Sequence, residues 1–137
     1  MEIHDADRGD CAGLARMNRE LIEDEGHENP MSTAELGTRM EGFLTSGYRA
    51  FLFREEGETV GYALVDTTRS PLYLRQFFIA RGHRRRGYGR EAFRLLLGRL
   101  GADTIDIEVL YWNEAGLRFW ESLGFRPRSL YMRYREE

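Results

Sequence analysis

The sequence contains no lysine, one cysteine and three prolines among its 137 residues. Every fixed side-chain cation is therefore an arginine, and a genome biased toward arginine codons explains this better than any function. The lone Cys11 cannot form an internal disulfide, which agrees with a reducing compartment. The chain also lacks a proline- or serine-rich linker and any internal repeat. We therefore expect a single domain over residues 1–137.

Long apolar runs are absent as well, since none approaches the roughly 20 residues that cross a bilayer. The first residues lack the basic start and apolar stretch of a signal peptide. These absences predict a cytoplasmic protein that does not bind membranes. The formal net charge of −3 and the pI near 5.7 argue against a general nucleic-acid binder.

Charge is nevertheless distributed unevenly. Residues 20–35 contain six acids and no arginine, whereas residues 81–94 contain six arginines and one acid, Glu91. The first segment should attract cations and the second anions. Alternatively, the acidic segment is simply a solvated helix end, as most runs of charged residues are.

The spacing of apolar residues predicts an alternation of helices and strands. Ser32 and Glu35 form a capping box, and Gly47 ends the helix behind it. Asp7 is expected to cap the first helix, which should fray near Gly26. Strands are predicted at residues 2–6, 49–54, 59–66, 72–80, 104–110 and 129–134, and helices at 7–26, 32–47, 87–100 and 113–123.

This order, β-α-α-β-β-β-α-β-α-β, predicts an α/β (α+β) fold. Residues 55–58 give a hairpin signal, so the strands on either side should pair antiparallel. Residues 72–110 form a strand, helix and strand, which should make a right-handed parallel crossover. We therefore expect a mixed, mainly antiparallel central sheet with helices on both faces.

The most informative segment is the run Arg84-Arg85-Arg86-Gly87-Tyr88-Gly89. It follows an apolar strand and opens an amphipathic helix, so its backbone N–H groups should face an anion at a helix N-terminus. Glycines let the backbone approach a phosphate closely, and arginines add bidentate donors. A pyrophosphate is the natural ligand, although a glycine-bearing turn with a solvated basic face would look similar. A dinucleotide-binding Rossmann unit fits worse, because its three-glycine fingerprint is missing.

Two motifs together resemble the GNAT (GCN5-related N-acetyltransferase) superfamily. Residues 73–89 resemble its motif A, whose loop consensus Gln/Arg-x-x-Gly-x-Gly/Ala is matched by Arg84, Gly87 and Gly89. About 24 residues further on, residues 113–125 resemble motif B, Asn-x-x-Ala-x-x-Phe-Tyr-x-x-x-Gly-Phe. The order of elements also matches, and the resemblance covers nearly the whole chain.

The resemblance implies a GNAT-like acyl-CoA N-acyltransferase fold that binds acetyl-CoA or coenzyme A as co-substrate. The loop would hold the CoA pyrophosphate through backbone amides. The strand at Phe77 to Ile79 would run beside the pantetheine arm, where it splays from the strand at 104–110, and a main-chain N–H would polarise the thioester carbonyl. The implied cofactor-binding residues are Phe77, Phe78, Ile79, Arg84, Arg85, Arg86, Gly87, Tyr88, Gly89, Arg90, Asn113 and Trp120. Asn113 is equally well explained as a helix N-cap.

The sequence departs from the family at positions that matter for catalysis. Trp120 stands where many relatives have a tyrosine proposed as the general acid, and an indole cannot titrate near neutral pH. Tyr111 is the nearest alternative acid. Arg75 and Gln76 stand near the position where several relatives have a glutamate that acts as the general base. Candidate bases elsewhere are Glu25, Asp24 and His27 in the turn after the first helix, and Glu108 on the splayed strand.

The leading hypothesis is direct acetyl transfer from acetyl-CoA to a primary amine of a small cationic molecule, within a ternary complex. No covalent intermediate is expected, because Cys11 is better explained as a small buried apolar residue. The alternative is a CoA-binding regulatory module that has lost catalysis. An RNA-binding patch on residues 81–94 is disfavoured by the acidic total. The sequence implies no metal, and residues 128–134 could form an exposed edge through which a homodimer pairs.

Overall fold

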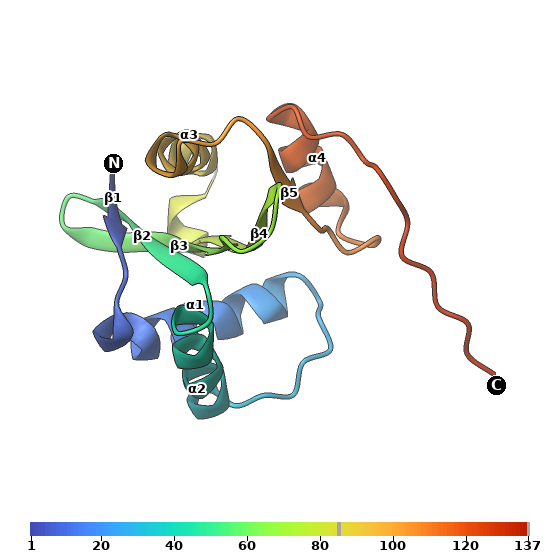
Figure 1. Cartoon of the computed structure of the whole chain (residues 1–137), viewed down its shortest axis with the longest axis horizontal. Coiled ribbons are helices and arrows are strands. Elements are labelled where there is room, and N and C mark those ends of the chain that lie inside the picture. The colour runs from blue at the N-terminus through green and yellow to red at the C-terminus, as the bar shows by residue number, and fades with distance from the viewer. Residues whose placement is uncertain (85, 137) are drawn as a thin grey trace.

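A computed structural model describes residues 1–84 and 86–136. Its elements confirm the predicted order up to the last helix (Figure 1). They are β1 (Glu2–Asp5), the 3₁₀ turn η1 (Arg8–Asp10), α1 (Cys11–Asp24), α2 (Thr33–Leu44), β2 (Tyr48–Glu55), β3 (Glu58–Asp66), β4 (Leu72–Ile79), the 3₁₀ turn η2 (Arg81–His83), α3 (Tyr88–Leu100), β5 (Ile105–Ile107) and α4 (Glu114–Ser122). No helix within the described ranges is long and apolar enough to span a bilayer.

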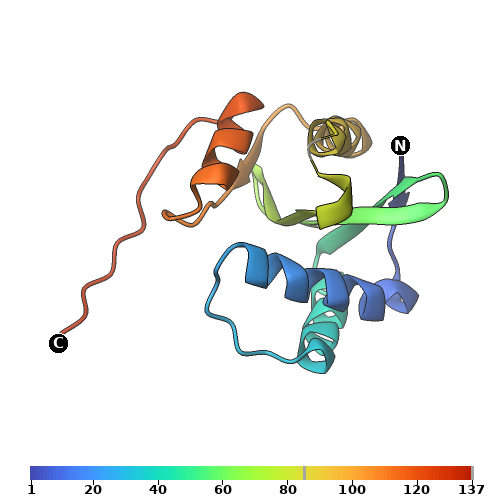
Figure 2. The same ribbon diagram turned by 180° about the vertical axis from the view of Figure 1, so that it is seen from behind.

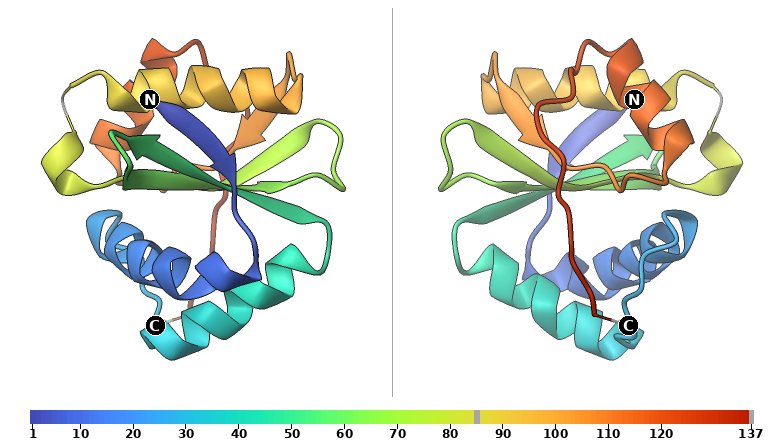
Figure 3. Two further views of the ribbon diagram at one scale, coloured as in Figure 1. Left: turned by 90° about the vertical axis from the view of Figure 1, so that its left-hand side faces the viewer. Right: turned by 90° about the vertical axis from the view of Figure 1, so that its right-hand side faces the viewer.

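The strands form one sheet in the order β1-β2-β3-β4-β5. Every pairing is antiparallel except that of β4 with β5, which is parallel. Helices α1 and α2 cover one face of the sheet, and α3 and α4 lie on the other (Figures 1 and 3). The mixed, mainly antiparallel sheet with helices on both faces and one parallel crossover is therefore confirmed.

Alternation along the strands divides the apolar side chains between two cores. Phe51, Phe53 and Val65 pack with Phe93 and Leu96 of α3. Residues of the opposite parity face α1 and α2, and they form a second cluster of Leu14, Leu21, Met40, Leu52, Tyr62, Leu64 and Phe78. Each pair of helices thus packs on its own face of the sheet through a separate apolar cluster.

The two helices before β2 begin with different caps. Ser32 and Glu35 form the predicted capping box, in which the Glu35 N–H donates to Ser32 Oγ (3.2 Å) and the Ser32 N–H to Glu35 Oε1 (2.9 Å). The prediction that Asp7 caps the first helix directly is wrong by one turn. Asp7 caps the 3₁₀ turn η1, and α1 starts only at Cys11.

Two predicted strands differ from the structure. The strand expected at 104–110 is shorter, because β5 separates from β4 after the pair Leu74–Ile107 and ladder hydrogen bonds cease. The strand expected at 129–134 is absent: these residues are extended but pair with no strand among the described residues, so β5 remains one edge of the sheet, and β1 is the other. Helix α4 is covered on one side only, and its apolar residues Phe119, Trp120 and Leu123 are half-buried.

Candidate active site

Strands β4 and β5 diverge at the centre of the molecule. They pair only between Leu72–Leu74 and Ile105–Ile107, whereas β4 continues to Ile79. Beyond Leu74, the edge of β4 that faces away from β3 has no strand partner among the described residues. The backbone of residues 75–79 is therefore available to an extended ligand, which could lie along β4 as a further strand would.

The unpaired end of β4 leads through η2 to the N-terminus of α3. Gly87 is the N-cap of this helix, with φ 75° and ψ 5°, a left-handed conformation that favours glycine. A Cβ added at Gly87 would meet no atom within 4 Å, so the space in front of the helix is open. The unpaired N–H groups of the first turn and the positive end of the helix dipole together form an anion site there.

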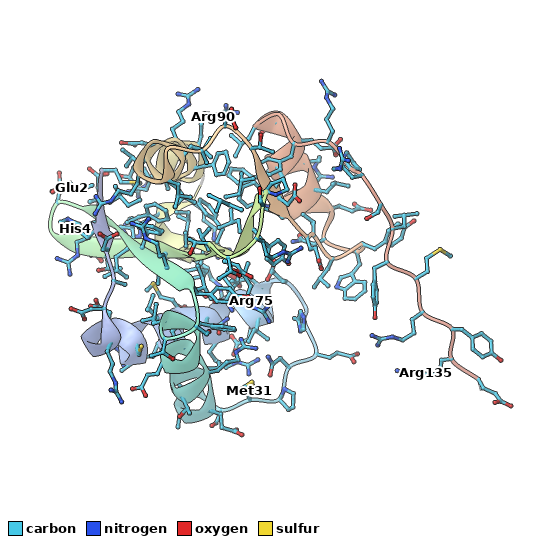
Figure 4. The ribbon with its side chains drawn as sticks, viewed as in Figure 1. Glu2, His4, Met31, Arg75, Arg90 and Arg135 are labelled. Atoms are coloured by element: carbon cyan, nitrogen blue, oxygen red, sulfur yellow. The ribbon has the colours of Figure 1, made fainter. Side chains whose placement is uncertain are left out.

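Not all of the predicted basic side chains face this space. Arg84 Nε donates to the Ile79 carbonyl oxygen (2.7 Å), and its guanidinium also binds Asp24. Arg90 Nη2 donates to the Ser122 carbonyl oxygen of α4 (3.2 Å). Arg86 is exposed beside Gly87, and Arg85 lies outside the described residues. In Figure 4, Arg90 points outward from the α3 side, while Arg75 lies on the α1 and α2 side of the sheet.

The aromatic residues named from the sequence serve mainly as packing. Trp120 meets Phe77 edge to face with ring centroids 5.1 Å apart, and it also packs on Phe93, Phe119 and Phe125. Phe78 is buried on the opposite face beside Tyr62. Only the backbone of Phe77, Phe78 and Ile79 is therefore placed to meet a ligand along the open edge.

Three further positions have structural roles. Gly89 lies so close to α4 that an added Cβ would be 3.0 Å from two Phe119 ring carbons. The Tyr88 ring stacks on His83, with centroids 6.0 Å apart. Asn113 is the N-cap of α4, since its side-chain oxygen accepts a hydrogen bond from the Gly116 N–H (3.0 Å). The N-cap interpretation is thus confirmed, which leaves the Asn113 amide nitrogen free to donate.

Asp24 joins the acidic segment to the basic loop. Its carboxylate accepts hydrogen bonds from Arg81 (2.9 Å from Nε and 2.6 Å from Nη2) and from Arg84. Burial alone would raise the pKa of Asp24, but the bonds from Arg84 and Arg81 outweigh it and hold the pKa below its ordinary value. A carboxylate of lowered pKa is a weak base, so Asp24 is better suited to holding the loop than to accepting a proton.

Glu25, next in the chain, has the opposite character. It is half-buried, and burial, followed by the charge of Asp24, raises the pKa of its carboxyl. Trp112, from the loop between β5 and α4, donates its indole N–H to the Glu25 carbonyl oxygen (3.3 Å). This contact brings Glu25 to the side of the sheet where β4 and β5 diverge.

The other predicted catalytic residues lie further out. Tyr111 is 83% exposed on the same loop as Trp112, and His27 is exposed in the connection between α1 and α2. Glu108 follows β5 and is exposed. Burial and then the charge of Glu108 raise the pKa of Tyr73, which places Glu108 near the paired end of β4. The structure therefore brings Glu25 to the opening and leaves His27 and Tyr111 in solvent.

Two features of the site carry no signal in the sequence. One is the pairing of Asp24 with Arg81 and Arg84, across 57 and 60 residues of chain. The other is a buried hydrogen bond from the Tyr62 hydroxyl to Gln76 Oε1 (2.7 Å) beneath the site. Among the residues described, no three histidine, cysteine or carboxylate side chains lie close enough to hold a metal ion. Cys11 is buried, and burial raises the pKa of its thiol, which makes it a poor nucleophile.

Comparison with known proteins agrees with this geometry. A family model described as "Acetyltransferase (GNAT) family" matches residues 14–125. A thialysine N-epsilon-acetyltransferase from Sus scrofa is 28% identical over 142 residues, covering 90% of this chain and 83% of its own length.

Solved structures share the fold at lower identity. An aminoglycoside antibiotic 6'-N-acetyltransferase from Acinetobacter haemolyticus superposes with a TM-score of 0.76 at 15% identity, over 100% of this chain and 99% of its own. An aminoglycoside N-acetyltransferase solved in complex with CoA gives a TM-score of 0.74 at 15% identity, over 98% of this chain and 93% of its own. At such identities the likeness concerns the fold.

Proposed function

The chain belongs to the acetyltransferase (GNAT) family, and from that premise we propose that it transfers the acetyl group of acetyl-CoA directly to a primary amine of a small cationic molecule. One observation carries the proposal: the unpaired edge of β4 leads straight to an open helix N-terminus at Gly87. An extended chain that ends in a pyrophosphate matches an unpaired strand edge followed by an anion site.

The residues present fit acetyl-CoA. The pyrophosphate would bind the N–H groups at the start of α3, with Arg86 adding charge from the exposed side of Gly87. The pantetheine amides would pair with the backbone of Phe77 to Ile79, and the free amide nitrogen of Asn113 is available to the same arm. An N–H on this edge would polarise the thioester carbonyl as charge develops on its oxygen.

We assign proton removal to Glu25. The amine must lose a proton before its nitrogen forms a bond to the thioester carbon, and the C–S bond then breaks with release of CoA thiolate. A glutamate of raised pKa is a better base than an ordinary one, and burial supplies that rise here. Trp120 cannot donate the final proton at neutral pH, so the thiolate takes it from solvent.

A cationic acceptor is supported by the charges that remain around Glu25. Asp24 and Glu23 pair with Arg81, and Glu35 is used in the capping box of α2. Glu20 and Glu28 are exposed on either side of the turn, and with Glu25 they leave a negative potential where an amine would approach. The porcine relative is named for thialysine, a molecule of this chemical class. The lone buried Cys11 supports a reducing compartment such as the cytosol.

The test is release of CoA thiol with a panel of amines, measured against thioester hydrolysis without an acceptor. The panel should pair each cationic amine, such as a diamine or a lysine analogue, with a neutral amine of similar size. We expect turnover with cationic amines and a kcat/KM that falls as salt concentration rises. Binding of acetyl-CoA without turnover on any amine would overturn the proposal in favour of a CoA-binding module that has lost catalysis.

A further inference from the structure

Two arginines meet at one aromatic ring on the side of the sheet that α1 and α2 cover. Arg39 lies on α2 and Arg75 on β4, and their guanidinium carbons are 5.5 Å and 4.9 Å from the centroid of the Phe43 ring. Cation–π contacts of this kind attract both groups to the ring. Figure 4 shows Arg75 on this side of the sheet. The fold thus brings two positive charges together on the side that also carries Glu25, the proposed base.

A β-bulge turns Arg75 toward this side. The register between β3 and β4 shifts at residue 75, which has no partner on β3. Arg75 and Gln76 are neighbours in a strand, where regular alternation would send them to opposite faces. Both nevertheless reach the α1 and α2 side, Arg75 at Phe43 and Gln76 at Tyr62. The bulge therefore adds a cation to a face that alternation would give to Gln76 alone.

Neither arginine has a carboxylate partner in the part of the chain that the structure describes. Arg39 Nη2 donates to the amide oxygen of Asn18 (3.1 Å), and Arg75 Nη1 donates to the hydroxyl of Tyr48 (3.4 Å), so both acceptors are uncharged. Arg39 Nε is buried without a hydrogen-bond partner among these residues. Burial and then the charge of Arg75 lower the pKa of Arg39. An anion bound here would offset the repulsion between the two cations and use their remaining donors.

Glu25 lies near the arginines but forms an ion pair with neither in the described structure. Glu25 and Arg39 both act on the buried hydroxyl of Tyr62, since burial and then the charge of Glu25 raise the pKa of Tyr62 and the charge of Arg39 opposes them. The connection between α1 and α2, which begins at Glu25, projects from the molecule on the same side as α4 (Figures 1 and 2). A negative group and a pair of positive groups thus border one region. A molecule with an ammonium group at one end and an anion at the other matches this arrangement.

Two other anions are poor partners for the arginines. Burial and then the charge of Glu108 raise the pKa of Tyr73, whereas the charge of Arg75 lowers it, but Glu108 is exposed and forms no ion pair with Arg75 among the described residues. The phosphates of CoA would lie at Gly87, beyond the end of β4 at Ile79. The remaining source of an anion is the amine substrate itself.

We propose that the acceptor carries a carboxylate in addition to its reacting amine, and that Arg39 and Arg75 bind this carboxylate while the amine lies at Glu25. The inference rests on the proposed function and narrows its acceptor to an amino acid whose side chain ends in a primary amine. Such a molecule has two ammonium groups and one carboxylate, so it keeps the net positive charge that the acidic turn attracts. Its carboxylate takes charge-assisted hydrogen bonds from the planar guanidinium groups.

The first experiment compares acetylation of the side-chain amine in L-lysine and in L-lysinamide, where an uncharged amide replaces the carboxylate. Attraction to the acidic turn alone would favour lysinamide, because its charge is more positive. We expect instead that kcat/KM is roughly 10–100-fold higher for lysine, mainly through KM, since hydrogen bonds between charged groups are at stake. Arg75→Gln should abolish this preference and leave turnover of lysinamide nearly unchanged.

Arg69→Gln is the matched control for the loss of one arginine. Arg69 is exposed, and its guanidinium stacks on another ring of the same face, 4.2 Å from the centroid of Tyr73. R69Q should therefore keep the preference for lysine. A wild type that acetylates lysinamide or a simple diamine as well as lysine, or an R75Q variant that still prefers lysine, would overturn the inference and leave the proposed function intact.

A second experiment measures binding without turnover, by calorimetric titration of lysine and lysinamide into the CoA-bound chain. We expect lysine to bind wild type and R69Q, and to bind R75Q and Arg39→Lys roughly 10–100-fold more weakly. Arg39→Lys keeps the charge but loses the planar group, and circular dichroism checks its folding because Arg39 also bonds Asn18. Equal affinity of lysine for wild type and R75Q, or tighter binding of lysinamide to wild type, would contradict the inference. Absence of turnover on every amine would instead overturn the proposed function.

Discussion

The carboxylate of Asp24, the last residue of α1, accepts a hydrogen bond from the guanidinium of Arg84 in the loop that precedes α3. The same Arg84 donates to the Ile79 carbonyl at the end of β4 (2.7 Å). One arginine thus connects the helix beside the proposed amine site, the strand that would hold pantetheine and the loop that would hold pyrophosphate. In the proposed function, the two substrates would therefore bind on either side of a shared ion pair.

Replacing Asp24 with asparagine should lower the stability of the fold and make it less dependent on pH. The pKa of Asp24 is lowered in the folded chain, so its stabilising effect is present above the unfolded-state pKa and is lost as the pH falls through the folded-state value. We expect D24N to lose about 1 kcal/mol of unfolding free energy at neutral pH, because Arg81 and Arg84 are largely solvated. Denaturant unfolding at several pH values measures this.

The difference between wild type and D24N should shrink as the solution becomes acidic. Glu20→Gln is the control, since Glu20 is an exposed acid on the same helix. A D24N variant that is as stable as wild type at neutral pH, or that loses as much in acid as at neutral pH, would show that the ion pair does not stabilise the loop.

Replacing Glu25 with glutamine should slow turnover and remove the acidic limb of the pH–rate profile. The pKa of Glu25 is raised, so the group is fully deprotonated only at a pH above the ordinary range of glutamate, and activity should fall as the pH drops through that raised value. We expect kcat to fall roughly 10²–10⁴-fold with little change in the affinity for acetyl-CoA.

Glu28→Gln and His27→Gln alter neighbouring residues that are exposed to solvent, and both variants should keep the acidic limb. If E25Q retains the wild-type profile while H27Q loses the acidic limb, the proton acceptor is His27 and the assignment to Glu25 is wrong.

Tyr62→Phe should destabilise the chain although the substitution removes a single atom. The Tyr62 hydroxyl donates to Gln76 Oε1 (2.7 Å), and the Tyr62 side chain is fully buried. Without it, a buried amide oxygen loses its partner, which costs about 1–3 kcal/mol. Tyr48→Phe is a matched control, because Tyr48 is only half-buried and its hydroxyl accepts a long, exposed bond from Arg75 (3.4 Å). Equal losses for Y62F and Y48F in thermal unfolding would contradict the prediction.

Two glycines of α3 should respond in opposite directions to alanine. At Gly89 the added Cβ would meet the Phe119 ring at 3.0 Å, so G89A should lose about 1–3 kcal/mol by forcing α3 and α4 apart. At Gly98, inside the same helix, the added Cβ would meet nothing within 4 Å, and G98A should gain about 0.5–1 kcal/mol. Denaturant unfolding of both variants checks this, and a G89A variant as stable as G98A would show that the α3–α4 contact is not tight.

Much of the fold was predictable because its signals are local. The capping box at Ser32, the apolar alternation of β2 to β4 and the glycine before α3 each act within a few residues. The strand at 129–134 was predicted on the same grounds and is absent. Alternation records only that a segment can form a strand, whereas pairing depends on an edge that the sequence does not reveal.

In the candidate site too, only the features with a local signal could be predicted from the sequence. The loop at Gly87 is visible in the sequence because a helix N-terminus needs a particular kind of residue there. The different roles of Asp24 and Glu25 are not visible in the sequence, because the two residues are adjacent carboxylates. In the fold, Arg81 and Arg84 bind Asp24, whereas Glu25 is partly buried. Long-range partners, rather than residue type, set these two pKa values apart.

Calorimetric titration of acetyl-CoA into wild type, Gly87→Trp and Gly101→Trp tests whether the loop at Gly87 holds the pyrophosphate of acetyl-CoA. Gly87 and Gly101 flank the same helix, both have positive φ, and neither has an atom within 4 Å of an added Cβ, so the two substitutions impose similar strain. We expect micromolar binding by wild type, binding that is retained in folded G101W, and loss of binding in folded G87W. Failure of wild type to bind, or equal binding by the two variants, would contradict it.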